Sequence, residues 1–347
     1  MYFGRKTMTY INSLCTDVGT DNCPCPLAET GDCLICSRLA GRRECDCRWA
    51  GVCIYNEYIQ NGKLIRGKRE DLPAAVLKKI WYGSDLLAAV LQVSKGFALK
   101  ASQPGSFVFV NTEGKSGFSN VPVSVMKADP ENGQLFLALK IISAKTKAVA
   151  EEEKMLMLRG VYRNGLLGGG LEGLRDDVRS PGNGAERKKW LIITKGIGFA
   201  PSVNLMRSAK GRVKMDFIID TDKICDEIIM DHLQSEASAG ADEMTFRKES
   251  LQEVTENLRT ERAKGRSALL AGSFNVDEYD RIIILTSDYY IRTLTEYMNI
   301  PSHKLVFCNN FRMCCGEGIC GACGHIGKDG NVSKMCKCRS ADVRELL

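Results

Sequence analysis

The middle of the chain is a series of short apolar runs separated by turn residues. Between Phe107 and about Arg159, Gly, Pro and Asn punctuate the runs "SFVFVNTEG", "VPVSVMKAD", "GQLFLALKIIS" and "EKMLMLRG". Runs of strand length with such boundaries predict antiparallel strands in a small barrel or sandwich. The stretch before them, "PAAVLKKIWYGSDLLAAVLQV" at 73–93, can be read as a helix whose later part enters a sheet. We therefore predict an antiparallel β-barrel domain over residues 67–165.

The pattern then changes to strands and helices in alternation. The apolar runs "KWLIIT", "VKMDFIID", "EMTFRK", "RIIILTS" and "HKLVFCNN" are separated by the helical stretches "FAPSVNLMRSA", "KICDEIIMDHLQ", "SLQEVTENLRTERAKG" and "YYIRTLTEYMN". Such alternation predicts a doubly wound parallel α/β domain, which we place at 186–307. The Gly-rich, charged stretch "NGLLGGGLEGLRDDVRSPGNGAERKK" between the two domains is predicted to be an interdomain link or mobile loop.

Cysteines are crowded near both ends of the chain. Of sixteen cysteines among 347 residues, eight lie between Cys15 and Cys53 and six between Cys314 and Cys338. The first residues lack the apolar segment of a signal peptide, and no apolar run approaches the ~20 residues that span a bilayer. We therefore expect a cytoplasmic protein without a membrane partner, in which closely spaced cysteines bind metal more readily than they form disulfides.

Composition narrows the classes of function. The chain is 44% apolar and 26% charged, as in ordinary soluble proteins, and its length suits two or three domains. The net charge of +6, from 48 basic and 42 acidic residues, has no basic run or basic-aromatic stripe, which argues against a nucleic-acid partner. The three histidines have no ligand-like spacing, so no nucleophile and base pair is predicted.

The C-terminal cysteines have a recognisable spacing. Cys315, Cys320, Cys323 and Cys336 follow the order C-x4-C-x2-C and then a distant fourth cysteine, which is the plant-ferredoxin spacing for a [2Fe–2S] cluster. A tetrahedral zinc site is the alternative, although zinc usually draws its thiolates from two short knuckles. Cys338 competes with Cys336 as fourth ligand. We predict a [2Fe–2S] segment at 308–347.

The N-terminal cysteines predict a small metal-binding module over residues 1–66. Seven thiols fall within about thirty residues, in the pairs Cys23-x-Cys25, Cys33-x2-Cys36 and Cys45-x-Cys47, and at Cys53. That number exceeds the four ligands of one cluster, and the spacing suits either [4Fe–4S] or zinc, with disulfides as a third reading. We favour a second iron–sulfur cluster. The preferred ligands are Cys33, Cys36, Cys47 and Cys53.

The stretch "NNFRMCCGEGICGACG" resembles the "ERxMxCGxGxCGxC" passage of the electron-transfer subunit of dihydroorotate dehydrogenase, and of related small subunits of ferredoxin–NADP oxidoreductases and sulfide dehydrogenases. The likeness extends through roughly residues 73–338. It implies a flavin-binding barrel, a nucleotide-binding α/β domain and a terminal [2Fe–2S] segment. It also implies electron relay between a pyridine nucleotide, FAD and iron–sulfur clusters in a complex with a partner.

The resemblance assigns a flavin motif in which one residue is missing. "VPVS", Val121 to Ser124, stands where the family has Arg-Pro-x-Ser, so Val121 replaces the arginine that would neutralise the flavin pyrophosphate. The flavin-binding residues carried over are Pro122, Val123, Ser124, Lys140 and Thr146. Lys145 or Lys147 could compensate for the lost arginine.

The nucleotide motifs are also incomplete. Gly196 and Gly198 match the family's "GGGxGxAP" turn, where glycines let a phosphate approach a helix N-terminus, but Lys195 replaces a glycine. The Cys-Gly-Pro turn is absent, with Ser287 and Asp288 in its place. Asp220 is predicted either to hold a ribose hydroxyl or to cap a helix. NAD(P)H binding is therefore an open expectation.

We predict from these observations an oxidoreductase subunit, an electron-transfer flavoprotein that serves a catalytic partner subunit of a redox complex, or a ferredoxin. Electrons would enter from NAD(P)H or from the partner. The alternative is a zinc-stabilised interaction or scaffold module built on a decayed reductase fold.

Overall fold

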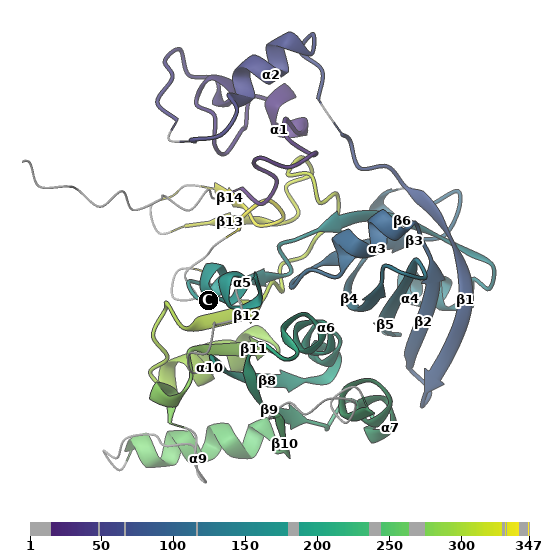
Figure 1. Ribbon diagram of the computed structural model, residues 1–347, viewed down its shortest axis with the longest axis vertical. Helices are drawn as coiled ribbons and strands as arrows, with labels where there is room; N and C mark the ends of the chain where they lie inside the picture. The colour runs from purple at the N-terminus through teal and green to yellow at the C-terminus, as the bar shows by residue number, and fades with distance from the viewer. Residues whose placement is uncertain are drawn as a thin grey trace, which may run out of the picture.

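A computed structural model describes the chain over residues 15–47, 49–65, 67–115, 117–179, 187–235, 244–263, 275–327, 330, 332–339 and 346. A cysteine-rich module, a β-barrel, an α/β domain and a C-terminal segment follow one another along the sequence (Figure 1). In the described residues no helix is long and apolar enough to cross a membrane.

The barrel closes in the strand order β1-β2-β5-β4-β3-β6. Its strands are β1 (Leu72–Tyr82), β2 (Leu86–Gln92), β3 (Phe107–Asn111), β4 (Val121–Asp129), β5 (Gln134–Lys140) and β6 (Met155–Tyr162), with helices α3 (Lys95–Ala101) and α4 (Ala144–Glu151). All neighbouring pairs are antiparallel. The barrel and its four strands from Phe107 onward are confirmed.

The helix predicted within 73–93 is wrong, because that stretch forms β1, a turn and β2. Gly83 makes the turn with φ +69°, and Leu86–Leu91 are buried in succession because β2 pairs with β1 on one side and β5 on the other. Leucine and alanine favour helices in isolation, but pairing within a closed sheet overrides that preference.

The α/β domain is a six-stranded sheet in the order β10-β9-β8-β11-β12-β7. Its strands are β7 (Leu166–Leu167), β8 (Lys189–Lys195), β9 (Lys214–Asp220), β10 (Met244–Lys248), β11 (Arg281–Leu285) and β12 (Leu305–Cys308), and only β7 at the edge runs antiparallel. Its helices are α5 (Leu171–Arg179), α6 (Phe199–Ala209), α7 (Asp226–Ile229), α9 (Leu251–Ala263) and α10 (Asp288–Tyr297), and a π-helical turn covers Met230–Gln234. The predicted α/β domain is confirmed.

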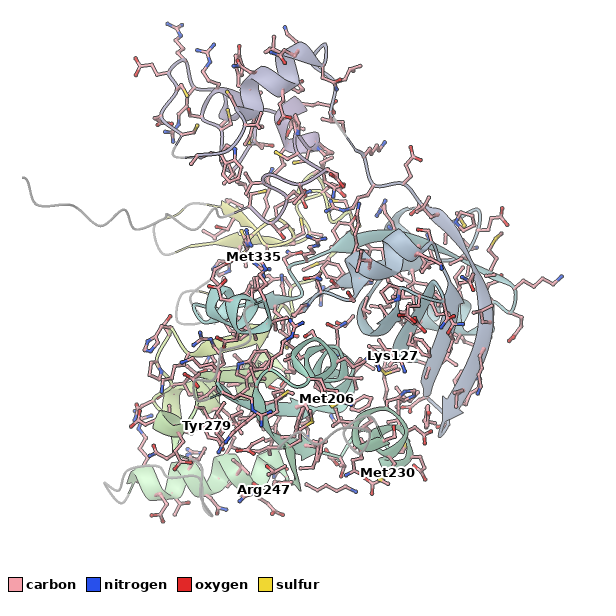
Figure 2. The ribbon with its side chains drawn as sticks, in the orientation of Figure 1. Lys127, Met206, Met230, Arg247, Tyr279 and Met335 are labelled. Carbon is pink, nitrogen blue, oxygen red and sulfur yellow. The ribbon has the colours of Figure 1, made fainter. Side chains whose placement is uncertain are left out.

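Two apolar clusters cover the two faces of this sheet. One contains Met206 of α6 with Trp190 and Ile192 of β8, and the other contains Tyr279 with Leu191 and Ile193. Met206 and Tyr279 are labelled in Figure 2. Alternate residues of β8 therefore point to opposite faces of the sheet, as expected for a pleated strand that is buried on both sides.

The predicted loop between the domains is structured over its first half. Residues 166–167 form β7 and residues 171–179 form α5, with Leu166, Leu167, Leu171 and Leu174 buried. Residues 180–186 of the same prediction lie outside the described residues. Gly168 has φ +120°, and an added Cβ would lie 2.3 Å from the Leu305 carbonyl oxygen. Glycine is therefore required here because two backbone segments approach closely. From the sequence alone, the same run of glycines predicted a flexible link.

The N-terminal module contains α1 (Pro26–Glu29) and α2 (Ile54–Gln60), and it lies against the C-terminal segment with its hairpin of β13 (Gly324–Ile326) and β14 (Val332–Lys334) (Figure 1). Cys15 and Cys338 form a β-bridge, and the Thr16 N–H donates to the Lys337 carbonyl at 2.8 Å. Segments from opposite ends of the sequence are thus joined by backbone hydrogen bonds.

Four buried charged side chains form ion pairs at this junction. Lys337 Nζ lies 2.7 Å from Asp17 and 2.6 Å from Glu317, and Arg69 Nη2 lies 2.6 Å from Asp17. The four side chains are between 0% and 14% exposed. The Tyr162 hydroxyl donates to Glu317 at 3.0 Å, and the Arg69 guanidinium lies over the Tyr162 ring. Two cations thus balance two anions where module, barrel and C-terminal segment meet.

Candidate functional site

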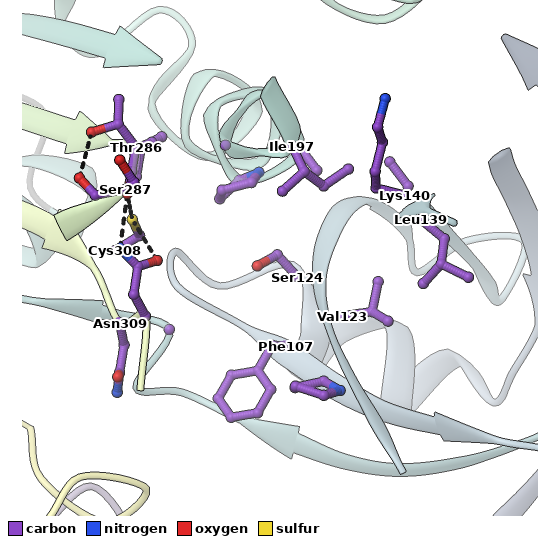
Figure 3. A pocket seen from close by; sticks show the side chains of 18 of the residues that line it. Phe107, Val123, Ser124, Leu139, Lys140, Ile197, Thr286, Ser287, Cys308 and Asn309 are labelled. Carbon is purple, nitrogen blue, oxygen red and sulfur yellow. Dashed lines mark hydrogen bonds between the residues drawn. The ribbon is translucent and has the colours of Figure 1, made fainter. Parts of the chain in front are cut away.

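A cleft of about 590 Å³ lies between the barrel and the α/β domain (Figure 3). Strands β4 and β5 and the start of α4 form one wall, while the β8–α6 turn, the end of β11 and residues 308–313 form the other. The predicted cofactor residues that line it are Pro122, Val123, Ser124, Lys140, Thr146 and Gly198. Gly196 is not among the lining residues. Phe107, Asn310, Phe311 and Met313 also line it. The last three lie within the stretch that carries the family resemblance, which assigns them no role, and no motif marks Phe107.

Val121, which replaces the arginine of the family's flavin motif, lies on the barrel wall of the cleft. Val121 and Val123 are buried in the barrel core, whereas Pro122 is exposed and Ser124 half-buried, as alternation along a strand requires. Val121 offers no charge to a ligand. Any anion held in this cleft must therefore find its cation elsewhere.

Two lysines line the cleft in the described part of the chain, and both are paired with carboxylates. Lys140 lies 2.6 Å from Asp85, and Lys195 lies 2.6 Å from Asp220 and 3.2 Å from Asp222. Burial alone would lower the pKa of Lys195, but its hydrogen bonds to the two carboxylates outweigh this and raise it. Lys195 therefore stays charged and bound within the protein.

Thr146 lines the cleft but its hydroxyl caps α4. Its Oγ1 accepts from the N–H groups of Ile142 and Ser143, both at 3.0 Å, and the Ser143 hydroxyl accepts from the Thr146 N–H at 3.3 Å. This reciprocal capping box starts the helix at the cleft wall. The threonine thus positions the helix N-terminus.

The turn between β8 and α6 is held by close packing. Gly196 has φ +57°, and a Cβ on Gly198 would lie 1.9 Å from the Leu285 carbonyl oxygen. Asp220, the residue with two predicted roles, accepts from the Leu251 N–H at 2.8 Å at the start of α9 and from Lys195. Asp220 is the last residue of β9 and therefore not the N-cap residue of a helix, but its carboxylate accepts from the first N–H of α9 and is committed to partners within the protein.

The end of β11 is bound to the segment after β12. The Thr286 carbonyl accepts from Asn310 Nδ2 at 2.8 Å and from the Cys308 thiol at 3.1 Å (Figure 3), and Asn310 Nδ2 also donates to Asp288 at 2.8 Å. Burial raises the pKa of Cys308 to about 12, so its thiol is protonated. These bonds connect the end of β11 to the segment after β12, at the position where the family resemblance predicts a Cys-Gly-Pro turn.

The structure places several C-terminal thiols close enough to interact. The side chain of Cys336 interacts with those of Cys315 and Cys323, and the side chain of Cys320 interacts with those of Cys315 and of the surplus Cys314. Two backbone N–H groups point at sulfur, from Glu317 to Cys315 and from Cys336 to Cys323, each at 3.3 Å. The proximity of the thiols and the directed N–H groups suit the ligand set of a [2Fe–2S] cluster.

In the described residues no group of three or more His, Cys, Asp or Glu side chains is arranged so that it could hold a metal ion as it stands. The assignment of Cys315, Cys320, Cys323 and Cys336 as ligands therefore stays a prediction. Cys338 is buried in the bridge to Cys15 and also interacts electrostatically with Cys323, so its competition with Cys336 for the fourth ligand position stays a prediction.

The cysteine loop packs directly on the barrel beside the cleft. Gly316 has φ +70°, and a Cβ there would lie 2.6–2.7 Å from ring carbons of Tyr162 and Phe109. The Tyr162 ring stacks on Phe107 at 5.1 Å between centroids, and Phe107 lines the cleft. Met313 packs against the same aromatic cluster and also lines the cleft. The cleft and the thiols thus share one aromatic wall.

The four predicted N-terminal ligands are divided between two neighbouring cavities. Cys36, Cys47 and Cys53 line one cavity together with Cys45, whereas Cys33 lines the other. Cys33 and Cys36 are nevertheless in contact, because the Cys36 N–H donates to Cys33 Sγ at 3.3 Å.

Neither a scan against protein-family models nor a search of the curated proteins gives a match. Solved structures do match. The NADH-dependent reduced ferredoxin-NADP oxidoreductase, described for flavin-based electron bifurcation, is 15% identical with a TM-score of 0.54 over 79% of this chain and 89% of that one. Phthalate dioxygenase reductase is 11% identical with a TM-score of 0.46, over 78% and 96%. The ferredoxin reductase of carbazole 1,9a-dioxygenase is 19% identical with a TM-score of 0.42, over 69% and 65%.

At 15% identity the first likeness establishes the fold, which is the barrel and α/β architecture of a ferredoxin reductase. Within that fold this chain carries a cysteine-rich segment near each end.

Proposed function

We propose that the protein is an electron-transfer flavoprotein subunit. FAD would occupy the cleft, and Cys315, Cys320, Cys323 and Cys336 would hold a [2Fe–2S] cluster. The observation that carries the proposal is the shared aromatic wall, since Phe107 and Met313 line the cleft and pack against the ring that supports the cysteine loop. A site for a two-electron carrier beside a site for a one-electron carrier is the arrangement that a relay needs.

The cleft suits a flavin in size and in chemistry. Its volume lies within the roughly 300–1,000 Å³ of small-molecule sites, and its walls are mostly apolar with a few polar groups. Pro122 and Ser124 would face the flavin, and the N-terminus of α4 would lie beside it. A bound flavin accepts electrons in a pair and releases them singly, a chemistry that belongs to the cofactor. The protein would place it and exclude water.

We infer that a redox partner protein exchanges electrons with this chain, and that a pyridine nucleotide is at most a secondary donor. The support lies in the nucleotide half of the cleft, where Lys195 is bound to Asp220 and Asp222, and Asn310 closes the end of β11. A catalytic subunit of a redox complex or a ferredoxin would have the required chemistry. The structural neighbours include ferredoxin reductases, which supports this class of partner.

The test is an absorption spectrum of the anaerobically purified chain, with flavin, iron, sulfide and zinc determined per chain. We expect flavin and iron–sulfur bands that bleach with dithionite but only slowly with NADH or NADPH. Cys320→Ser should remove the [2Fe–2S] bands and keep the flavin, whereas Cys225→Ser, a control in the α/β domain, should keep both. A colourless, zinc-containing protein would support the scaffold alternative and overturn the proposal.

A further inference from the structure

The eight cysteines of the N-terminal module divide into two sets of four around two separate cavities. Cys36, Cys45, Cys47 and Cys53, here called the outer quartet, line a cavity of about 270 Å³. Cys15, Cys23, Cys25 and Cys33, the inner quartet, line a much smaller one of about 10 Å³. No cysteine lines both cavities, although Ile54 does, and Cys33 contacts Cys36 across the division between them.

The backbone of the module builds the outer quartet through Ser37. The Ser37 hydroxyl donates to the Glu44 carbonyl and accepts from the Asp46 N–H, both at 3.0 Å, and the Ser37 carbonyl accepts from the Arg42 N–H at 3.0 Å. These bonds fold the loop at 42–47 back over Ser37. They bring Cys45 and Cys47, which flank Asp46, beside Cys36, which precedes Ser37.

The thiols of the outer quartet interact with one another. The side chain of Cys47 interacts with those of Cys45 and Cys53, and Cys36 interacts electrostatically with Cys47 and also with Cys33 of the inner quartet. Arg38 also lines the cavity and interacts electrostatically with Cys45 and Cys36. A guanidinium beside two of the sulfurs supplies positive charge where bound thiolates would accumulate negative charge.

The space between the four cysteines favours a cluster over a single zinc ion. A zinc ion draws four sulfurs to about 2.3 Å from one point and leaves no space between them. The outer cavity is on the order of twenty times the volume that one water requires. Ile54, Tyr55 and Trp49 wall it with apolar surface, and Trp49 is fixed by its bond to the Val52 carbonyl at 2.9 Å. Each thiolate of a cubane cluster binds a different iron, so the ligands surround a volume.

We infer that the outer quartet holds a [4Fe–4S] cluster, with Cys36, Cys45, Cys47 and Cys53 as its ligands. This set differs from the one predicted from spacing, because Cys45 replaces Cys33. The Cys36 N–H donates to Cys33 Sγ at 3.3 Å, so the C-x2-C pair straddles the boundary between the quartets. Adjacent cysteines that serve different sites also occur in two-cluster ferredoxins.

The inner quartet lies on the side of the module that contacts the C-terminal segment. Cys15 bridges to Cys338, Lys334 lies 3.0 Å from Asp32, and a Cβ on Gly318 would lie 2.9 Å from the Leu27 side chain. The outer quartet lies away from this contact, and its Cys45 and Cys53 are exposed. The outer cluster is therefore the redox group that the module presents to a partner.

The experiment compares Cys45→Ser with Cys33→Ser in the full chain, purified anaerobically. Iron and sulfide are measured per chain, and the dithionite-reduced proteins are examined by electron paramagnetic resonance. We expect Cys45→Ser to lose about four irons, the content of one [4Fe–4S] cluster, together with its signal. Cys33→Ser should keep both. Cys53→Ser, at a second exposed position, should behave as Cys45→Ser does.

The [2Fe–2S] signal serves as the internal check that each variant is folded. Loss of the [4Fe–4S] signal in Cys33→Ser with retention in Cys45→Ser would overturn the assignment, as would loss in both. Stoichiometric zinc in the module in place of iron would also overturn it. The inference does not depend on the flavin, so a chain that lacked flavin but lost iron selectively in Cys45→Ser would contradict only the proposed function.

Discussion

Replacing Lys337 by methionine should destabilise the junction between the N-terminal module and the cysteine loop. Lys337 is fully buried, and its ammonium group serves both Asp17 and Glu317. Methionine fills a similar volume without charge, so two carboxylates would share Arg69 alone. The site would change from neutral to a net charge of about −1 in a region from which water is excluded.

Removing one partner from a buried ion pair costs about 3–5 kcal/mol, and we expect a loss of this size in the free energy of unfolding. The assay is urea denaturation of the metal-loaded chain, followed by circular dichroism and by the cluster absorption. Iron content before denaturation shows whether the variant still binds the cluster proposed beside Lys337. Lys100→Met is the matched control, because the Lys100–Asp21 pair is 55% and 83% exposed, and no measurable change is expected.

The double variant Asp17→Asn/Lys337→Met tests the reasoning itself. If the cost arises from an uncompensated buried charge, removing the carboxylate as well should recover a large part of the lost stability. Simple addition of the two single effects would refute this explanation, and so would a Lys337→Met variant as stable as the wild type.

Three further outcomes follow from contacts at the cleft and the loop. Gly316→Ala should lose the [2Fe–2S] absorption and keep the flavin, because its Cβ would collide with the rings of Phe109 and Tyr162. Gly321→Ala is the control, since Gly321 has a similar positive φ but open space around it. This variant should keep the cluster if the collision is the cause. Gly198→Ala should lower the stability by about 1–3 kcal/mol in thermal unfolding, because its Cβ would overlap the Leu285 carbonyl. Burial alone would raise the pKa of Asp220, but hydrogen bonds from Lys195 and from backbone N–H groups lower it in the folded protein. The ionised carboxylate therefore stabilises the fold at pH values above the pKa of the unfolded state. This stabilisation is lost as the pH falls through the pKa of the folded state. Lys195→Met should therefore lose stability at a higher pH than the wild type in melting curves between about pH 3 and 6, and superimposable acid profiles would contradict this.

Much of the fold could be predicted because its patterns are local. The strands from Phe107 to Tyr162 and the alternating elements after Lys189 show their own periodicity and turn residues. The strands β1 and β2 could not be predicted in the same way. Their Ala and Leu residues favour a helix, and only pairing with β5 and β6, distant in sequence, decides for a sheet.

A ligand set could be predicted for the C-terminal cysteines because the chemistry of a cluster requires a fixed spacing, and the side chains of these cysteines interact with one another. Their role as ligands stays a prediction. Spacing gives less guidance for the N-terminal set, because it does not reveal which way a side chain points. Ser37 joins Cys36 to Cys45 and Cys47 through its hydrogen bonds, and no sequence signal identifies that role. Likewise, the pairing of Lys195 with Asp220 appears only when β8 and β9 lie side by side.

The contact between Asp17 and Lys337 joins residues 320 positions apart, and this separation governs the order of assembly during synthesis. The cysteine-rich module leaves the ribosome before the surface on which it docks has been translated. Domains fold as they emerge, so the module first exists without Lys337, Glu317 or the bridge to Cys338. The side of the inner quartet that contacts the C-terminal loop therefore stays open to solvent until that loop has been made.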